Sequence, residues 1–233
     1  MASDVPSPPT RLFVMKKLLG GQDDTEFIKV EPVNRGPGLH CPQCGNGIGM
    51  LTWEPPYRAE LELYGKAYGD LVDGPGSGLL VTERFANDFR AEGLTGLSGF
   101  HPVEVVRVRR KRPGPKAGLP PRYLYVTVGH GQPAADMERS RIKGSRPMGC
   151  TWCRYVGTDA IDGIVLEAGT WHGEDVFEPR GLWGTTVVSE RFMRFAERHA
   201  MSHMSFVPIE KYVYDPSGHF YPRSVQSDPP SRS

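Results

Sequence analysis

Two short stretches decide how this chain can fold: GLHCPQCGNG, from Gly38 to Gly47, and PMGCTWCRYV, from Pro147 to Val156. Each contains one Cys-x-x-Cys pair, and all four cysteines of the chain lie in these two pairs. The 105 residues between the pairs are many more than the gap in a contiguous zinc ribbon. The spacing therefore raises the question of whether two distant segments supply ligands to one ion.

Composition and the chain start indicate where the protein works. The N-terminal residues lack the basic start and apolar run of a signal peptide, and no segment approaches the roughly 20 apolar residues of a membrane span. We therefore expect a cytoplasmic protein without membrane association, whose thiols stay reduced. A net charge of +1 does not mark the whole chain as a nucleic-acid binder. Polar, Pro-rich ends predict a disordered segment at 1–8 and a flexible tail at 216–233.

Segments around the two cysteine pairs also resemble each other. LLVTERFANDFRAEGL, from Leu79 to Leu94, follows the first pair, and TVVSERFMRFAERHAM, from Thr186 to Met201, follows the second at a similar distance. Further on, GFHPVEVV matches SFVPIEKY, and upstream PTRLFVM matches PRYLYVTV. Four features thus recur in the same order at an offset of about 106 to 112 residues. This recurrence predicts an internal duplication.

The repeated pattern leads to a fold prediction. Each copy combines several strand-like segments with one helix, which is typical of an α+β unit. We predict two copies related by a pseudo-twofold axis, each with several antiparallel strands, one main helix and a Cys-x-x-Cys zinc knuckle. The first copy spans residues 9–112, the second spans 121–215, and residues 113–120 form a Pro- and Gly-rich linker. Strands are expected at 60–63, 103–108, 123–128, 163–168 and 184–189.

Each predicted helix begins at a capping residue. The hydroxyls of Thr82 and Ser189 can accept hydrogen bonds from the first free N–H groups of the helices. Gly93 is expected to end the first helix, because glycine readily adopts the left-handed conformation found there. We expect Arg84 and Arg191, at equivalent helix positions, to pair with a carboxylate from the strand that follows each helix. The alternative is that both guanidinium groups are simply solvated.

The four cysteines suit a zinc ion. Zinc takes four thiolates in a tetrahedron, and two intervening residues let both sulfurs of one turn reach the same ion. A pseudo-twofold arrangement would bring one knuckle from each copy to a single structural zinc ion between them, held by Cys41, Cys44, Cys150 and Cys153. Arg154 stands where the first knuckle has Gly45, which predicts a distorted second turn. Buried cysteines without a metal, or a redox pair, remain alternatives.

Other segments offer candidate binding surfaces. The basic run at 107–116 could contact phosphate, so a zinc-containing nucleic-acid-binding protein is the alternative function. A solvated loop is the simpler interpretation, and nucleic acid is not the expected partner. Candidate partner-binding residues are four aromatic side chains and a compact acidic group: Trp53, Tyr57, Trp171, Trp183, Asp23, Asp24 and Glu26.

The doubled cysteine motif and the repeated Val-(Thr/Ser)-Glu-Arg-Phe helices resemble a known family, the double-CxxCG motif proteins of myxobacteria. The resemblance runs from about Arg11 to Tyr214. It implies a non-enzymatic immunity protein of a Sit-type polymorphic toxin system, which binds and neutralises a toxin delivered between cells. It also implies metal ligation by Cys41, Cys44, Cys150 and Cys153, and no catalytic residue. The sequence leaves the toxin and the oligomeric state open.

Overall fold

A computed structural model describes residues 11–16, 25–29, 34–65, 67–111 and 118–221. Within them the chain is an α+β protein built mostly of strands with two α-helices, which confirms the predicted class. Residues 1–8 lie outside the described residues, as do 113–117 of the predicted linker and 222–233 of the predicted tail.

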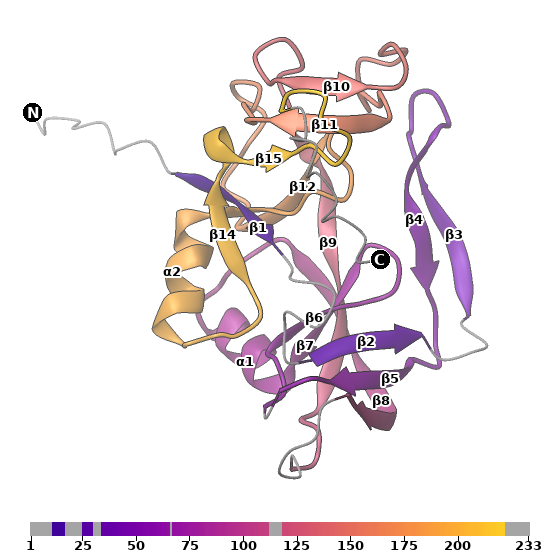
Figure 1. The fold of residues 1–233 in the computed structure, drawn as a ribbon, viewed down its shortest axis with the longest axis vertical. Coiled ribbons are helices and arrows are strands. Elements are labelled where there is room, and N and C mark those ends of the chain that lie inside the picture. The colour runs from indigo at the N-terminus through magenta and orange to yellow at the C-terminus, as the bar shows by residue number, and fades with distance from the viewer. Residues whose placement is uncertain (1–10, 17–24, 30–33, 66, 112–117, 222–233) are drawn as a thin grey trace, which may run out of the picture.

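The largest sheet in the described chain has ten strands (Figure 1). Eight of them follow the order β14-β1-β13-β12-β9-β8-β5-β2, while β7 also pairs with β9 and β6 pairs with β7. Their bounds are β1 Leu12–Lys16, β2 Thr25–Lys29, β5 Arg58–Leu63, β6 Leu71–Asp73, β7 Gly78–Thr82, β8 Leu97–Arg110, β9 Tyr123–Ala134, β12 Val176–Arg180, β13 Val187–Ser189 and β14 Ser205–Pro208.

Two smaller sheets and a short helix complete the described structure. One sheet has the order β10-β11-β15, and the other is the hairpin β3–β4. Figure 1 shows this hairpin along one side of the molecule, with its tip directed toward β10 and β11. The bounds are β3 Arg35–His40, β4 Gly47–Trp53, β10 Ile142–Gly144, β11 Thr158–Asp162, β15 Val213–Tyr214 and the 3₁₀ helix η1 Ile209–Lys211.

The predicted helix starts are confirmed. Helix α1 spans Glu83–Ala91 and α2 spans Glu190–Arg198. The Thr82 hydroxyl accepts a hydrogen bond from the Phe85 N–H at 3.2 Å, and the Ser189 hydroxyl accepts one from the Phe192 N–H at 3.1 Å. Each cap satisfies an N–H that the first helical turn cannot pair internally.

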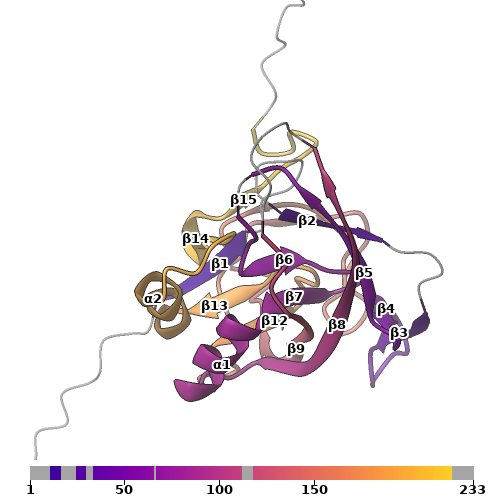
Figure 2. The same cartoon turned by 90° about the horizontal axis from the view of Figure 1, so that it is seen from below.

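Helices α1 and α2 lie on the same side of the large sheet (Figures 1 and 2), and their apolar side chains pack in one cluster. The rings of Phe85 and Phe195 lie 5.6 Å apart, edge to face, and those of Phe89 and Phe192 lie 6.3 Å apart. These rings pack on Phe13 and other apolar side chains from one face of the sheet. Because side chains alternate along a strand, the opposite sheet face buries a second apolar cluster.

The opening strand of each half pairs with strands of the other half. Strand β1 lies between β13 and β14, which flank α2, while β9 lies between β7 and β8, which flank α1. The registers correspond, because Leu12 is opposite the helix cap Ser189 and Tyr123 is opposite the helix cap Thr82. The two predicted repeats therefore share one sheet through these exchanged strands.

Arg84 and Arg191 bind carboxylates that precede their helices, so the expected partner strand was wrong. Arg84 Nη2 lies 2.6 Å from Asp70 Oδ2, and Arg191 Nη1 lies 3.1 Å from Asp175 Oδ2. Asp70 and Asp175 come directly before β6 and β12. Each carboxylate also accepts a hydrogen bond from the cap hydroxyl of the same half, which explains the choice of partner: the cap brings carboxylate and arginine together.

Each of these aspartates also crosses to the other half. Asp70 accepts hydrogen bonds from the backbone N–H and hydroxyl of Ser202, and Asp175 accepts them from the same groups of Thr95. The two arginines cross as well: Arg84 donates to the His199 carbonyl at the end of α2, and Arg191 donates to the backbone carbonyl at the end of α1. The same polar network thus occurs twice, once at each junction.

Some predicted elements differ from the structure. Residues 163–168 form no strand and contribute only an isolated bridge between Ala135 and Leu166. Of 184–189, only Val187–Ser189 is a strand. Strand β8 continues to Arg110, into the segment expected to be a loop. Apolar sequence alone could not place these ends, because pairing partners decide where a strand stops.

Candidate metal centre

The first cysteine pair lies at the tip of the β3–β4 hairpin. The Cys41 N–H donates to the Asn46 carbonyl at 2.8 Å, and the Gly45 N–H donates to the Cys41 carbonyl at 2.9 Å. These bonds close a tight turn that places both sulfurs of the pair on the same side. Gly45 has a φ of 73°, a left-handed conformation that glycine adopts without a steric penalty from a Cβ atom.

The second knuckle forms the same turn with a different residue. The Arg154 N–H donates to the Cys150 carbonyl at 2.9 Å, and Arg154 has a φ of 54°. The expected distortion is therefore absent from this hydrogen bond. Contacts of the Arg154 side chain stabilise this left-handed backbone conformation, because the guanidinium donates to the Ala135 carbonyl at 2.6 Å and pairs with Glu167.

The two knuckles bring all four sulfurs together. Every sulfur lies within 4.8 Å of the others, and across the halves Cys41 Sγ is 3.9 Å from Cys150 Sγ and Cys44 Sγ is 3.8 Å from Cys153 Sγ. These distances exclude disulfides, whose sulfurs lie about 2 Å apart. A tetrahedron with metal–sulfur bonds of about 2.3 Å has edges of about 3.8 Å. The four thiols therefore fit one metal ion.

Backbone N–H groups favour the thiolate form of the first cysteine in each pair. For Cys150, the N–H of Cys153 contributes most and that of Trp152 adds to it, which lowers the thiol pKa to about 7. For Cys41, burial opposes ionisation, but the N–H groups of Cys44 and Gln43 lower the thiol pKa overall. A low pKa prepares a sulfur for metal binding, because metals bind the thiolate.

The second cysteine of each pair is less acidic. Burial raises the pKa of Cys153 to about 12. The Asn46 N–H lowers the pKa of Cys44, but burial and the neighbouring thiols of Cys41 and Cys150 raise it overall. Cys41 and Cys153 are 3% and 0% exposed and pack with Ile48 and nearby aromatic side chains. Cys150 is half-buried and Cys44 is exposed. A set of four protein thiols is typical of a structural metal site rather than a catalytic one.

The four aromatic residues predicted to bind a partner lie in three different apolar clusters of the described structure. Trp53 is 4% exposed and packs in an apolar cluster with Ala59 and Leu61. The Tyr57 ring stacks on His101 and Tyr125, with ring centres 5.1 and 5.3 Å apart.

The other predicted contact residues are also dispersed. Glu26 lies opposite Glu62 in the β2–β5 pair. The Trp171 indole donates to the Glu174 carbonyl at 3.0 Å, whereas Trp183 packs beside the metal centre. Asp23 and Asp24 lie outside the described residues.

The basic segment at 107–116 is partly neutralised within the sheet. Arg109 lies 2.6 Å from Glu60, and Lys111 lies 2.6 Å from Glu62. Residues 112–116 lie outside the described residues. The ion pairs turn two of the basic side chains toward β5, which weakens the alternative of a phosphate-binding surface.

The β3–β4 hairpin carries an apolar surface that the sequence analysis missed. Leu39, Met50 and Leu51 are 38%, 64% and 49% exposed, and they line hollows between the hairpin and the large sheet. The apolar run GIGMLTW, from Gly47 to Trp53, could have indicated this surface. The run does not show, however, that the segment forms a hairpin separate from the main sheet. We call these three side chains the hairpin ridge.

The comparisons with known proteins give no identity. No protein-family model matches the chain, and no similar sequence is found among curated proteins. In the described part of the chain, neither α-helix has the length and apolar character needed to cross a membrane.

Proposed function

We propose that the four cysteines hold one zinc ion that joins the two halves. The sulfur separations of 3.8 and 3.9 Å across the halves support tetrahedral coordination, and an all-thiolate set favours zinc over harder cations. The ion would fix the tip of the β3–β4 hairpin against the second half. Four protein thiolates leave no position for a substrate, so its role is structural.

We also propose that the halves arose by internal duplication. The exchanged strands β1 and β9, the equivalent aspartates Asp70 and Asp175, and the matching knuckle turns support this origin. Every one of these contacts recurs in the other half with the roles reversed. Such reciprocity is what a pseudo-twofold relation between two copies requires.

The observation that carries the proposed function is the exposed hairpin ridge. Three large apolar side chains, Leu39, Met50 and Leu51, are exposed on the separate two-stranded hairpin β3–β4. Exposed apolar patches of this kind mark interaction sites, and a rigid display reduces the entropy lost on binding. The protein is therefore a binding protein rather than an enzyme, and its partner is another protein.

The resemblance to the double-CxxCG motif family gives this partner a class. The chain acts as an immunity protein that binds a toxin delivered into the cell and blocks it, and it meets that toxin in the cytoplasm. The chain binds the toxin through the hairpin ridge, on the hairpin whose tip the zinc ion fixes. Zinc contributes indirectly, because it holds the hairpin in the binding conformation.

A protection assay tests this function. The toxin encoded beside the gene for this chain is expressed in a bacterial host, with and without the chain, and growth is measured. Full growth only in the presence of the chain supports the proposal. The variant Met50→Asp should lose protection while retaining its metal, whereas Val213→Asp, at another exposed apolar position, should protect normally. Equal growth arrest with and without the wild-type chain contradicts the proposal.

A further inference from the structure

A cleft of about 670 Å³ lies beside the metal centre and the hairpin ridge. Strand β4, the turn between β6 and β7, and the segments around Tyr155 and Trp183 form its walls. Met50 of the hairpin ridge lines both this cleft and the neighbouring apolar hollows. The volume is in the range of sites that enclose a side chain or a small ligand.

Negative groups outnumber positive ones in this cleft. Its lining contains the carboxylates of Asp73, Asp159 and Glu178, and a single basic side chain, Arg146. Arg146 stacks on the Tyr155 ring, with its guanidinium carbon 4.7 Å from the ring centre. Asp159 forms no ion pair within the described residues. A cleft with this balance and with aromatic walls favours a cationic guest.

Glu178 supplies a buried charge at the base of the cleft. It is 3% exposed, accepts a hydrogen bond from the Gly184 N–H at 3.0 Å, and lies 3.3 Å from His130 Nδ1. Burial lowers the pKa of His130 even though Glu178 opposes this shift, so the imidazole is neutral at pH 7. Neutral His130 does not cancel the negative charge of Glu178, and a buried carboxylate without a cation is costly.

Trp183 provides a separate indication of a ligand. Its indole N–H is buried and has no hydrogen-bond acceptor within the described residues. The side chain lines the cleft and packs against His130, with ring centres 5.5 Å apart. A buried donor without an acceptor is uncommon in a folded protein, and a carbonyl oxygen of a bound peptide segment would satisfy it.

We propose that this cleft receives an arginine side chain of the partner protein, which Glu178 and Asp159 bind while the Trp183 indole donates to a main-chain carbonyl beside that arginine. A planar guanidinium can bind carboxylates and stack on aromatic walls. The inference rests on the proposed protein-binding function and specifies the partner: an apolar patch for the hairpin ridge with an arginine next to it. Arginine is a frequent anchor residue at such interfaces.

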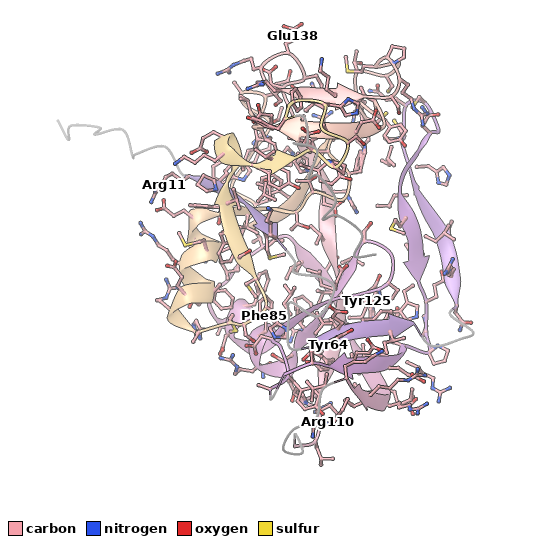
Figure 3. The ribbon with its side chains drawn as sticks, viewed as in Figure 1. Arg11, Tyr64, Phe85, Arg110, Tyr125 and Glu138 are labelled. Atoms are coloured by element: carbon pink, nitrogen blue, oxygen red, sulfur yellow. The ribbon has the colours of Figure 1, made fainter. Side chains whose placement is uncertain are left out.

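A peptide titration tests the cleft without the toxin. The ¹⁵N-labelled, zinc-loaded chain is titrated with acetyl-Gly-Arg-Gly-amide, and the Trp183 indole signal is followed by NMR after assignment with Trp183→Phe. Glu178→Gln should weaken peptide affinity roughly tenfold and Asp159→Asn about two- to fivefold. Glu138→Gln is the control, because Glu138 is exposed at the edge of the molecule (Figure 3) and does not line the cleft.

The outcomes separate the cleft from the function. A saturable Trp183 shift that weakens in Glu178→Gln and Asp159→Asn, but not in Glu138→Gln, supports the proposal. No shift, an equal shift with acetyl-Gly-Glu-Gly-amide, or a shift on concentrating the protein without peptide overturns it, the last assigning the cleft to a second copy. Asp159→Asn keeps the test informative if Glu178→Gln misfolds. Peptide binding without toxin protection contradicts the proposed function alone, and protection without peptide binding contradicts the cleft alone.

Discussion

The first knuckle turns at Gly45, whereas the second turns at Arg154, and yet both close with a 2.9 Å hydrogen bond from that residue's N–H to the carbonyl of the first cysteine. Glycine reaches the left-handed conformation freely, but an L-residue loses about 1 kcal/mol or more there. The second half offsets this loss with the Arg154 contacts to Ala135 and Glu167. Equivalent backbone geometry is therefore maintained by local freedom in one half and by tertiary contacts in the other.

The helix ends repeat this contrast. Gly93 follows α1 with a φ of 62°, and Ala200 follows α2 with a φ of 47°. Both N–H groups bond to the last turn of their helix, at Arg90 and Glu197. The first half again uses glycine where the second half uses a residue with a side chain. The two halves thus form the same contacts with different residues.

The largest expected effect comes from removing one ligand of the shared site. Cys44→Ser and Cys150→Ser should each lose the whole metal content and about 4 kcal/mol or more of unfolding free energy, because the ion needs ligands from both halves. Mass spectrometry of the native protein and chemical denaturation measure both quantities. If either variant kept about half of the metal, each knuckle would bind its own ion, and the two halves would not share one metal site.

The two aspartate junctions should differ in strength. Asp175 and Asp70 hold the same groups, but their side chains are 3% and 10% exposed. Asp175→Ala should therefore cost about 3 kcal/mol and Asp70→Ala about 2 kcal/mol, since each leaves cap and backbone donors without an acceptor. Urea denaturation of the metal-loaded variants measures the difference. A larger loss at Asp70 would contradict burial as the cause.

Paired substitutions at Arg154 separate strain from contact. Arg154→Ala keeps the strained conformation and loses the guanidinium contacts, so it should cost about 2 kcal/mol. Arg154→Gly removes the strain as well and should cost only about 1 kcal/mol. Thermal unfolding measures the unfolding free energy of both variants, and the difference between the two values gives the energy of the strained backbone conformation. Gly45→Ala, whose added Cβ would meet nothing within 4 Å, is the matched control and should cost about 1 kcal/mol.

The helix ends offer an exchange experiment. Ala200→Gly should stabilise the protein by about 1 kcal/mol, because glycine adopts the left-handed conformation without the penalty that alanine has. Gly93→Ala should destabilise by a similar amount, since an added Cβ would meet only Arg191 Nη2 at 3.8 Å. The double variant should then match the wild type in melting temperature. A destabilising Ala200→Gly would indicate that the alanine methyl contributes packing that outweighs its strain.

The smallest effect concerns the residues that cap the two helix ends. Glu92 Oε1 lies 2.7 Å from His199 Nε2, and this contact with additional help from Arg198 lowers the Glu92 pKa. A lowered folded-state pKa means that the contribution is present above the ordinary glutamate pKa and is lost as the pH falls through the folded value. NMR titration of Glu92 should show the lowered pKa in the wild type and a higher one in His199→Ala, where only Arg198 still lowers it. An unchanged Glu92 pKa in His199→Ala would show that the contact between Glu92 and His199 does not stabilise the junction of the two halves.

The sequence by itself determined the local features. The repeated Thr-Glu-Arg-Phe and Ser-Glu-Arg-Phe segments fixed both helix starts, because capping depends on residues three positions apart. Gly93 predicted the end of α1, because glycine readily adopts the left-handed conformation found there. The two Cys-x-x-Cys pairs predicted a shared metal centre, because together they supply the four thiolates of one tetrahedral site, and the structure brings these four sulfurs together.

Only the tertiary structure decided the contacts between distant segments. The partners of Arg84 and Arg191 lie upstream because Asp70 and Asp175 come together with the capping hydroxyls in space, and helix periodicity carries no information about that. The exchange of β1 depends on pairing across more than a hundred residues, since Leu12 lies opposite Ser189, whereas β9 pairs with segments closer along the chain, with Tyr123 opposite Thr82. Burial placed Trp53 in the core and left Met50 exposed, although both belong to the same strand. Sequence therefore fixed the turns, caps and ligands, whose energies are local, and the packed fold fixed the partners and surfaces, whose energies depend on neighbours far along the chain.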